Sequence, residues 1–390
     1  MKGNIYGYDM SKNMTFVQVH CSTQSACNAA KKVVENTGFI FGDFPFSTYP
    51  TFESNIPFVM RFMIDCKMSG MCWIQVKKEH LKNVDFKISS CLLEFEVEAD
   101  KLIALPPEGE WSRIPPLRIL SFDIECTSDK NTFPEAEKDP VIQIACVISK
   151  FGCSVPFYRI VFSLRKCAPI TGAIVESFDS EYSLLLRFSK FLQQADPDFV
   201  TGYNVLNFDF PYLLERAKVL GVEDFDFLGR LMGVKTKARD TIFSSKAYGT
   251  RESKTINLDG RVVFDLIQVI QRDYKLRSYS LNSVSAHFLD EQKEDVPHSI
   301  IPDLFNGNEE TRRRLAVYCL KDAYLPIRII DRIMCLYNYI EMARVTGVPF
   351  NFLLSRGQQV KVISQLYRKA IDENFLIPSL KVEASDEQYE

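Results

Sequence analysis

The 390-residue sequence is poor in histidine, with 4 residues, and in tryptophan, with 2. Its 11 cysteines are scattered through apolar segments, and no two of them have the spacing of a Cys-x-x-Cys pair. With so few histidines beside them, these cysteines give no zinc-ligand pattern. We therefore expect buried free thiols in a reducing compartment rather than a zinc site.

The sequence also lacks long hydrophobic runs and an excess of positive charge. No stretch approaches the ~20 apolar residues that span a bilayer, and the amino terminus has no basic-then-apolar signal pattern, so we expect an intracellular protein without a membrane span. The net charge is −3 and the pI about 6.0. A protein that holds DNA by charge alone would usually be basic. Either this chain does not bind nucleic acid, or it gathers acid in a metal site and keeps basic residues in local patches.

A turn-rich segment between Ala104 and Pro116 divides the chain. The hydrophobic content of 46% and charged content of 25% are those of a globular protein, and the length suits two or three domains. Before the turns, at 1–116, we expect an α+β domain. Its predicted elements are strands at 14–19, 58–64 and 72–76 and a helix at 25–34.

After the turns, strand and helix patterns alternate, which predicts an α/β domain with a mixed sheet at 117–335. Asp259-Gly260 favours a two-residue hairpin turn between strands at 255–258 and 261–266. The other predicted strands are 117–125, 141–150, 157–164 and 198–203. Helices are predicted at 181–194, 211–220, 311–337 and 354–374.

Two acids end the first strand of this domain. Asp123 and Glu125 are two residues apart, so their side chains point to the same side of a strand. Neighbouring carboxylates repel each other unless a cation neutralises them. Acids of this kind hold the paired ions, ~3.5–4 Å apart, of two-metal phosphodiesterases. An isolated Asp-x-Glu is nevertheless more often two solvated acids, because short motifs match by chance.

Two further signals support a metal site. Asp209 follows the strand at 198–203 and precedes Pro211, which suits the first turn of a helix; alone, Asp209 would be interpreted as a helix N-cap. Tyr318 and Asp322 are four apart on a predicted helix and share one face. Together, an acid pair on a strand, an acid after a loop and Tyr-x-x-x-Asp on a helix predict one site for divalent cations.

Three segments carry a resemblance. Phe-Asp-Ile-Glu at 122–125, Tyr-Asn-Val-Leu-Asn-Phe-Asp at 203–209 and Tyr-Cys-Leu-Lys-Asp at 318–322 resemble the exonuclease motifs of family B DNA polymerases. The resemblance implies a ribonuclease H-like (DnaQ-type) 3′→5′ exonuclease fold. Flanking segments resemble the replicative delta polymerases of that family, closely from about residue 117 onward: they are 139–143, 274–279, 291–295 and 354–362.

The resemblance implies roles for the acids. Asp123 would bridge two Mg²⁺ ions, Glu125 and Asp322 would hold the ion that activates water, and Asp209 would support the second ion. Tyr318 would orient the attacking water or the scissile phosphate. Mn²⁺ could replace Mg²⁺. The reaction would be proofreading, which releases nucleoside 5′-monophosphates from a single-stranded DNA 3′ end.

The DNA contacts expected from the same resemblance are Asn204 and Phe208. Segment 244–254, with Tyr248, resembles the family's strand-separating hairpin, and an ordinary surface loop is an equal alternative. Arg312 to Arg314 are expected to form a solvated face. Other basic residues are candidates for phosphate contact: Lys235, Lys237, Arg239, Arg251, Lys254, Arg356 and Lys361.

The polymerase motifs of the family's palm do not occur in this sequence. We therefore expect a fragment: a partial amino-terminal domain at 1–116, the exonuclease domain at 117–335, and a segment at 336–390 that returns to the amino-terminal domain before the palm. Expected partners are the DNA primer 3′ end, the remaining polymerase domains, accessory subunits and a sliding clamp, in the nucleus. Two alternatives stay open: an RNA-trimming exonuclease of the same fold, or a catalytically silent DNA-binding or structural module.

Overall fold

The computed structural model describes residues 3–4, 15–129, 132–153, 155–245, 249–291 and 296–379. The chain forms two compact units. The first unit contains Met1–Leu81, Val97–Ser112 and Asn338–Glu390, and the second contains Lys82–Glu96 and Arg113–Tyr337. Carboxyl-terminal residues thus belong to the same unit as the amino-terminal ones.

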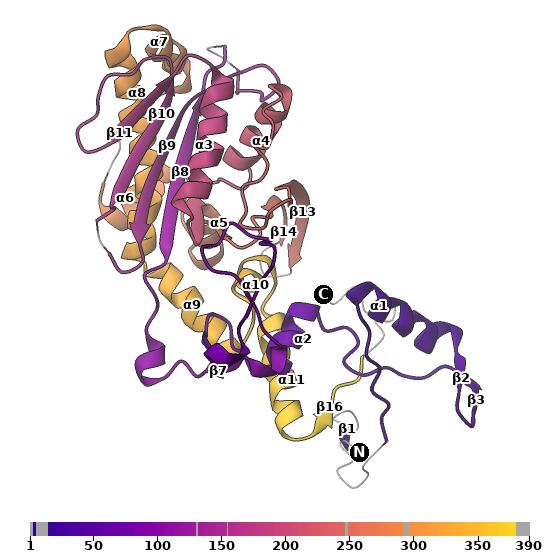
Figure 1. Cartoon of the computed structure of the whole chain (residues 1–390). Helices are drawn as coiled ribbons and strands as arrows, with labels where there is room; N and C mark the ends of the chain where they lie inside the picture. The colour runs from indigo at the N-terminus through magenta and orange to yellow at the C-terminus, as the bar shows by residue number, and fades with distance from the viewer. Residues whose placement is uncertain are drawn as a thin grey trace. The chain divides into compact units, whose positions relative to one another are not determined.

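A six-stranded mixed sheet forms the centre of the second unit, which confirms the predicted fold class (Figure 1). β9 (Val141–Lys150) runs antiparallel to its two neighbours, whereas β8, β12 and β15 are parallel to one another. β9 is almost wholly buried, as expected for a strand covered on both faces. The order across the sheet is β11 (Ile174–Phe178), β10 (Tyr158–Leu164), β9, β8 (Arg118–Cys126), β12 (Phe199–Gly202) and β15 (Val262–Asp265).

Helices cover the two faces of the sheet (Figure 1). α3 (Glu181–Ala195) and α4 (Asp209–Val219) cover one face, where Phe122 packs against Phe188 and Phe210. α8 (Glu309–Arg332) covers the other, with Ala316, Cys319 and Ala323 against the β9 residues Ala145 and Val147. Because these side chains are small, α8 lies close to the sheet. The helices that complete the unit are α5 (Leu266–Asp273), α6 (Leu281–Leu289) and α7 (Ile301–Asn306).

Segment Lys82–Glu96 was expected within the amino-terminal domain but groups with the second unit. Main-chain hydrogen bonds explain this: the Ser90 N–H donates to the Arg230 carbonyl, and the Met232 N–H donates to the Ile88 carbonyl, both at 2.8 Å. The short strands β5 (Lys82–Asn83) and β6 (Phe95–Glu96) close the segment.

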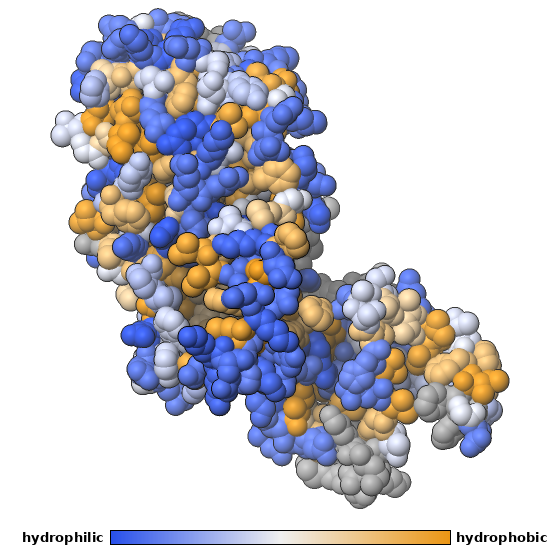
Figure 2. Space-filling view, in the orientation of Figure 1, coloured by the Kyte–Doolittle hydropathy of each residue, from blue (hydrophilic) through white to orange (hydrophobic). Residues whose placement is uncertain are grey.

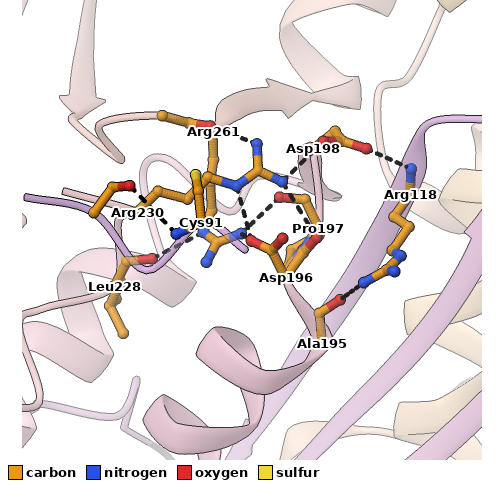
Figure 3. Close-up of polar contacts among 11 residues, drawn as sticks. Cys91, Arg118, Ala195, Asp196, Pro197, Asp198, Leu228, Arg230 and Arg261 are labelled. Atoms are coloured by element: carbon orange, nitrogen blue, oxygen red, sulfur yellow. Dashed lines mark hydrogen bonds and ion pairs between the residues drawn. The ribbon is translucent and has the colours of Figure 1, made fainter. Parts of the chain in front are cut away.

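An ionic cluster around the buried Arg261 side chain anchors the loop that holds this segment (Figure 3). Arg230 Nε and Arg261 Nη1 both donate to one oxygen of Asp196, at 2.8 and 2.7 Å. Arg261 also donates to the carbonyls of Pro197 and Leu228, and its side chain is fully buried. The cluster therefore joins the end of α3, the start of β12 and the start of β15.

The first unit combines segments that are distant in sequence. α2 (Phe58–Asp65) packs Met60 and Ile64 against Tyr367 of α11 (Gln359–Asp372). Exposed apolar side chains gather over β2 and β3, where Ile40 and Phe46 lie (Figure 2). The remaining elements are α1 (Gln24–Lys32), β2 (Phe39–Phe41), β3 (Phe44–Ser47), β4 (Trp73–Gln75), β7 (Ile103–Leu105), α10 (Phe350–Ser355), and β1 (Gly3–Asn4) paired with β16 (Phe375–Leu376). α9 (Cys335–Thr346) begins in the second unit and ends in the first.

Two predicted strands of the amino-terminal region were wrong. Residues 58–64 form helix α2, because Met60 and Ile64 are four apart and share its buried face. Residues 15–19 form no strand and are largely exposed, with no neighbouring strand to pair with; Met14 lies outside the described residues. The strand at 72–76 and the helix at 25–34 are confirmed, apart from their bounds.

The predicted Asp259-Gly260 hairpin was also wrong. The dipeptide makes a turn, with Gly260 at φ +85°, but the strands beside it do not pair with each other. β14 (Gly249–Ile256) pairs with β13 (Ala238–Ser245), and β15 pairs with β12 in the central sheet. Burial of Phe264 in the sheet decided the partner of β15.

Three smaller differences concern the carboxyl-terminal half. The helix predicted at 311–337 is α8 followed by α9, with Met334 at φ +52° between them, and the helix at 354–374 is α10 and α11. Arg312, expected on a solvated face, is buried and donates to the carbonyls of Lys166, Phe305 and Gly307. All 11 cysteines are free thiols, but the expected burial holds for only Cys126, Cys146, Cys319 and Cys335; Cys21 and Cys153 are exposed and the other five are partly buried. None of the helices in the described ranges is long and apolar enough to cross a membrane.

The ionic cluster generates a stability prediction. Arg261→Met should lower the free energy of unfolding of the second unit by about 2 kcal/mol, because it removes the donor of the Pro197 and Leu228 carbonyls and an ion pair whose arginine side chain is buried. Arg313→Met, which removes an exposed pair with Glu310, should cost less than about 1 kcal/mol. Urea unfolding followed by circular dichroism measures this, since both tryptophans, Trp73 and Trp111, lie in the first unit. Equal losses in the two variants would contradict the prediction.

Candidate active site

The acid pair lies at the end of β8, on the face of the sheet that α8 covers. Asp123 is opposite Ala145 in the register with β9, and Glu125 is opposite Gln143. Both partners face α8: Ala145 packs against it, and the Gln143 side-chain amide donates to the Arg312 carbonyl at 2.9 Å. Cross-strand neighbours point to the same face, so Asp123 and Glu125 point toward α8.

A thiol completes a cluster with this pair. A carboxylate oxygen of Asp123, a carboxylate oxygen of Glu125 and Cys319 Sγ all lie within 4.8 Å of one another. The Cys319 thiol donates to the Asp123 carbonyl at 3.4 Å. Burial raises the pKa of Cys319 well above its ordinary value, and the charges of Asp123, Glu125 and Asp322 raise it further. The thiol therefore stays neutral, and the carboxylates are the groups that could hold a hard metal ion.

Asp209 reaches the acid pair from the other face. The Ile124 N–H, between the two acids, donates to Asp209 Oδ1 at 3.2 Å. This N–H is available because β12 pairs with β8 only as far as Ser121. Asp209 is the first residue of α4 and is buried, while Phe208 occupies the N-cap position without a side-chain cap. Asp209 is therefore not a helix N-cap, the interpretation that its sequence context alone would favour.

Burial and neighbouring charge disfavour the ionised form of Asp209. Burial raises its pKa, and the charges of Asp265 and Asp322 raise it further, to about 8. Asp322, on α8, is itself buried. A buried group of carboxylates that repel one another is the environment that a divalent cation stabilises. The donor set, carboxylate oxygens from three separate elements, therefore fits a metal ion.

The loop that carries Asp209 depends on two unusual backbone positions. A Cβ on Gly202 would overlap the Val205 side chain and lie 2.6 Å from the Phe122 carbonyl, so only glycine lets the loop lie against β8. Asn204 adopts a left-handed conformation, φ +69°, and its carbonyl accepts the N–H groups of Asn207 and Phe208 at 3.2 and 3.0 Å. The loop is therefore a tight turn that ends at Asp209.

Tyr318 lies on α8 immediately before Cys319. It is half-buried, and its ring packs beside a cluster that includes Ile142 and Leu315. Its place on the helix, one turn before Asp322, puts it on the face of α8 that meets the sheet. The structure thus brings Asp123, Glu125, Asp209 and Asp322 into one neighbourhood and places Tyr318 beside it.

The predicted DNA contacts are placed less completely. Phe208 is half-buried, with its ring 5.4 Å from Phe133, whereas Phe210 is wholly in the core. Tyr248 lies outside the described residues, as does the side chain of Arg251, whose backbone is in β14. Arg356 is exposed in the first unit, after α10, with its guanidinium 5.4 Å from the Phe352 ring centroid.

The hairpin expected at 244–254 is present as β13 and β14, and its base is bonded to the Asp209 loop. The Lys254 N–H donates to Asn207 Oδ1 at 3.0 Å, and Asn207 Nδ2 donates to Asn204 Oδ1 at 3.1 Å. Of the nearby basic residues, Lys235 pairs with Asp226 at 3.0 Å, and Lys237 and Arg239 are exposed. The described parts of this segment are thus strands, and the strand-separating role stays a prediction.

Sequence reasoning did not single out Gly202, Asp265 or Cys319. Cys319 directly follows Tyr318 within the Tyr-x-x-x-Asp motif, and the sequence gave no reason to expect a thiol beside the carboxylates. Gly202 and Asp265 are paired residues at the ends of neighbouring strands β12 and β15. The sequence analysis paired strand 261–266 with strand 255–258 across Asp259-Gly260, so its pairing with β12 was not expected.

Comparisons with known proteins agree with this geometry. The family described as "DNA polymerase family B, exonuclease domain" matches residues 49–284, a range that ends before Tyr318 and Asp322. The DNA polymerase delta catalytic subunit of Candida albicans is 54% identical over 389 residues, which is 100% of this chain and 37% of that protein. The corresponding Drosophila melanogaster subunit is 49% identical over 394 residues, 100% of this chain and 36% of that protein.

A solved structure is also similar. The family B DNA polymerase from the hyperthermophilic archaeon Pyrobaculum calidifontis superposes with a TM-score of 0.62 and 25% sequence identity, covering 85% of this chain and 38% of that one. The chain thus spans little more than a third of the length of the relatives it matches.

The buried Asp209 generates a pH prediction for the metal-free protein. Because its folded-state pKa of about 8 exceeds the ordinary 3.8, the folded protein binds the proton more tightly, and stability should fall as the pH rises from about 4 to about 8. Asp209→Asn keeps an oxygen for the Ile124 N–H but has no charge. In EDTA its stability relative to wild type should therefore be greater at pH 8 than at pH 5, by more than about 1 kcal/mol.

Urea unfolding at both pH values, followed by circular dichroism, measures this difference. Mg²⁺ at pH 8 should stabilise the wild type more than Asp209→Asn, because only the carboxylate gains from the cation. An identical pH dependence in the two proteins would contradict the prediction.

Proposed function

Since the chain belongs to the exonuclease-domain family of the family B DNA polymerases, we propose that it removes nucleotides from the 3′ end of single-stranded DNA. The observation that carries the proposal is the hydrogen bond from the Ile124 N–H to Asp209, which brings an acid of α4 to the acid pair of β8. The delta-type relatives support a proofreading role for the reaction.

The carboxylates Asp123, Glu125, Asp209 and Asp322 would hold two Mg²⁺ ions, for which Mn²⁺ can substitute. Bound there, the ions would supply positive charge to the phosphate and lower the pKa of water. Asp123, which has a carboxylate oxygen within 4.8 Å of a Glu125 carboxylate oxygen, would help to hold both ions. Glu125 and Asp322 would serve the ion on the water side, and Asp209 the ion on the leaving-group side.

The rest of the reaction depends on residues that place the strand. Tyr318, one turn from Asp322, would orient the attacking water through its hydroxyl. Water attacks the terminal phosphorus, the bond from phosphorus to the preceding 3′ oxygen breaks, and that oxygen takes up a proton. The products are a nucleoside 5′-monophosphate and a strand one nucleotide shorter.

Selectivity would come from the need for an unpaired end. A mismatched terminus costs less energy to unpair than a matched one. Asn204 and Phe208 border the acids and would contact the terminal nucleotide, with Tyr248, Arg251 and Arg356 as further contacts. The β13–β14 hairpin, bonded to the Asp209 loop through Asn207, would separate the strands.

The wider role follows from the delta-type relatives. We propose that the chain acts together with polymerase domains, a sliding clamp and accessory subunits in nuclear DNA replication. The division at 116 and 335 into an amino-terminal domain, an exonuclease domain and a returning segment is part of the same proposal.

The first test removes the acid pair. Asp123→Ala/Glu125→Ala should lower nucleotide release from 3′-labelled single-stranded DNA in Mg²⁺ by more than about 100-fold, because each group stabilises charge in the transition state. Glu135→Ala/Glu137→Ala, a solvent-exposed pair with the same spacing, is the matched control and should keep full activity. Release that survives EDTA, or equal release from both double variants, would refute the assignment. RNA of the same sequence degraded as fast as DNA would favour an RNA-trimming enzyme.

The second test concerns Tyr318. Tyr318→Phe should lower the rate by about 100-fold with little change in DNA affinity, since it removes only the hydroxyl that positions water. Tyr324→Phe, on the same helix but packed against Arg159, should behave as wild type. Rates from labelled DNA and affinities from fluorescence anisotropy separate the two effects. Weaker binding at an unchanged rate would show that the role given to Tyr318 is wrong.

A further inference from the structure

Asp265 occupies the end of β15, beside the start of the Asp209 loop. In the parallel register of β12 and β15 it is the partner of Gly202, the last residue before the loop. Only 2% of Asp265 is exposed. It is also the N-cap of α5, where Oδ1 accepts the Ile267 N–H at 3.3 Å. A helix cap alone would account for one of its hydrogen bonds.

Two more hydrogen bonds connect Asp265 to the loop. Oδ1 accepts the Asn204 N–H at 2.8 Å, and Oδ2 accepts the Leu206 N–H at 3.0 Å. Both carboxylate oxygens therefore hold main-chain groups of the turn, one on each side of Val205. Val205 is the residue that packs over Gly202. These two hydrogen bonds, which we call the Asp265 clasp, thus hold the part of the loop that lies against β8.

The clasp compensates for an unfavourable backbone conformation. Asn204 at φ +69° is left-handed, a conformation that is unfavourable for a residue with a Cβ. Hydrogen bonds to a charged acceptor are stronger than those between neutral groups. Two such bonds outweigh the strain, so the turn is stable while Asp265 accepts both N–H groups. Without them, the two residues between Leu206 and the helix start at Asp209, Asn207 and Phe208, have fewer contacts that fix their positions.

Only a carboxylate suits this position. Three N–H groups converge on its two oxygens, and a carboxylate offers acceptors alone. An asparagine would turn an NH₂ group toward one of these donors. Burial raises the pKa of Asp265 to about 6, although its three N–H donors favour the charged form, so at pH 8 the group is ionised.

We propose that Asp265 is a positioning residue for the exonuclease reaction: by clasping the Asn204 and Leu206 N–H groups it fixes the loop that places the Asp209 carboxylate beside Asp123 and Glu125. It does not touch substrate and acts through Asp209. This inference rests on the proposed function.

The experiment is a double-mutant cycle between Asp265→Asn and Asp209→Asn, assayed on single-stranded DNA with Mg²⁺ at pH 8. Asp265→Asn alone should lower kcat about 10-fold or more and raise the Mg²⁺ concentration for half-maximal rate, with the KM for DNA changed less than about 3-fold. In the Asp209→Asn background the same substitution should cost less than about 2-fold, because the group it positions is already lost.

Asp198→Asn is the matched control. Asp198 also accepts a main-chain N–H, that of Arg118 at 2.8 Å, but beyond the opposite end of β12. It should leave kcat and the Mg²⁺ dependence unchanged at a temperature where circular dichroism shows every variant folded. Equal losses from Asp265→Asn in both backgrounds, a full-rate Asp265→Asn protein, or the same kcat loss from Asp198→Asn would overturn the positioning role. Inactive wild type would instead refute the proposed function, so the two failures are distinct.

Discussion

The hydrogen bond between the Ile124 N–H and Asp209 joins the main chain of β8, between two acids, to the first residue of α4. It exists because β12 leaves β8 after Ser121, which frees a main-chain donor between two acids. Everything around it keeps that donor and acceptor together: Gly202 lets the loop approach, Asp265 fixes the turn, and α4 starts at the acid itself. On the other face, α8 supplies Asp322 and Cys319. Burial of several carboxylates at this end of β8 is unfavourable because they lose solvation and repel one another, and a bound cation would offset both effects.

Much of this arrangement was predictable from residue patterns. Strands with apolar runs, such as β8 and β9, were placed within one or two residues, because burial on both faces leaves a strong signal. Asp123, Glu125 and Asp209 were singled out by their positions near the ends of a strand or a loop, and Asp322 by its four-residue spacing from Tyr318 on one helix face. Predictions from local sequence patterns were wrong where contacts between distant residues determine the strand pairing or the secondary structure. Asp259-Gly260 is a good hairpin turn, yet pairing of β15 with β12 buries Phe264 and outweighs it. Residues 58–64 are apolar enough for a strand, and only packing on Tyr367 selects the helix.

The number of arginines in this chain does not indicate how many of them could bind a phosphate group. Several guanidinium groups bind main-chain carbonyls inside the units and are unavailable for phosphate. Arg312 holds the start of α8, Arg261 holds the start of β15, and Arg344 donates to the carbonyls of Met71 and Ser112 in the first unit. The planar group with its several donors suits this use. Among the described basic residues of the β13–β14 hairpin and the segment before it, Lys237 and Arg239 are exposed.

The small side chains beneath α8 carry a consequence for inherited variation. Ala145, Ala316 and Ala323 have no exposed surface and set the spacing between the helix and the sheet. An added methyl or methylene group at any of them would act as a spacer and move Asp322 away from the acids of β8, because close-packed interiors do not absorb extra volume. None of these alanines has a functional group of its own. Substitution of these alanines would therefore disturb the acidic cluster without changing any of its own residues.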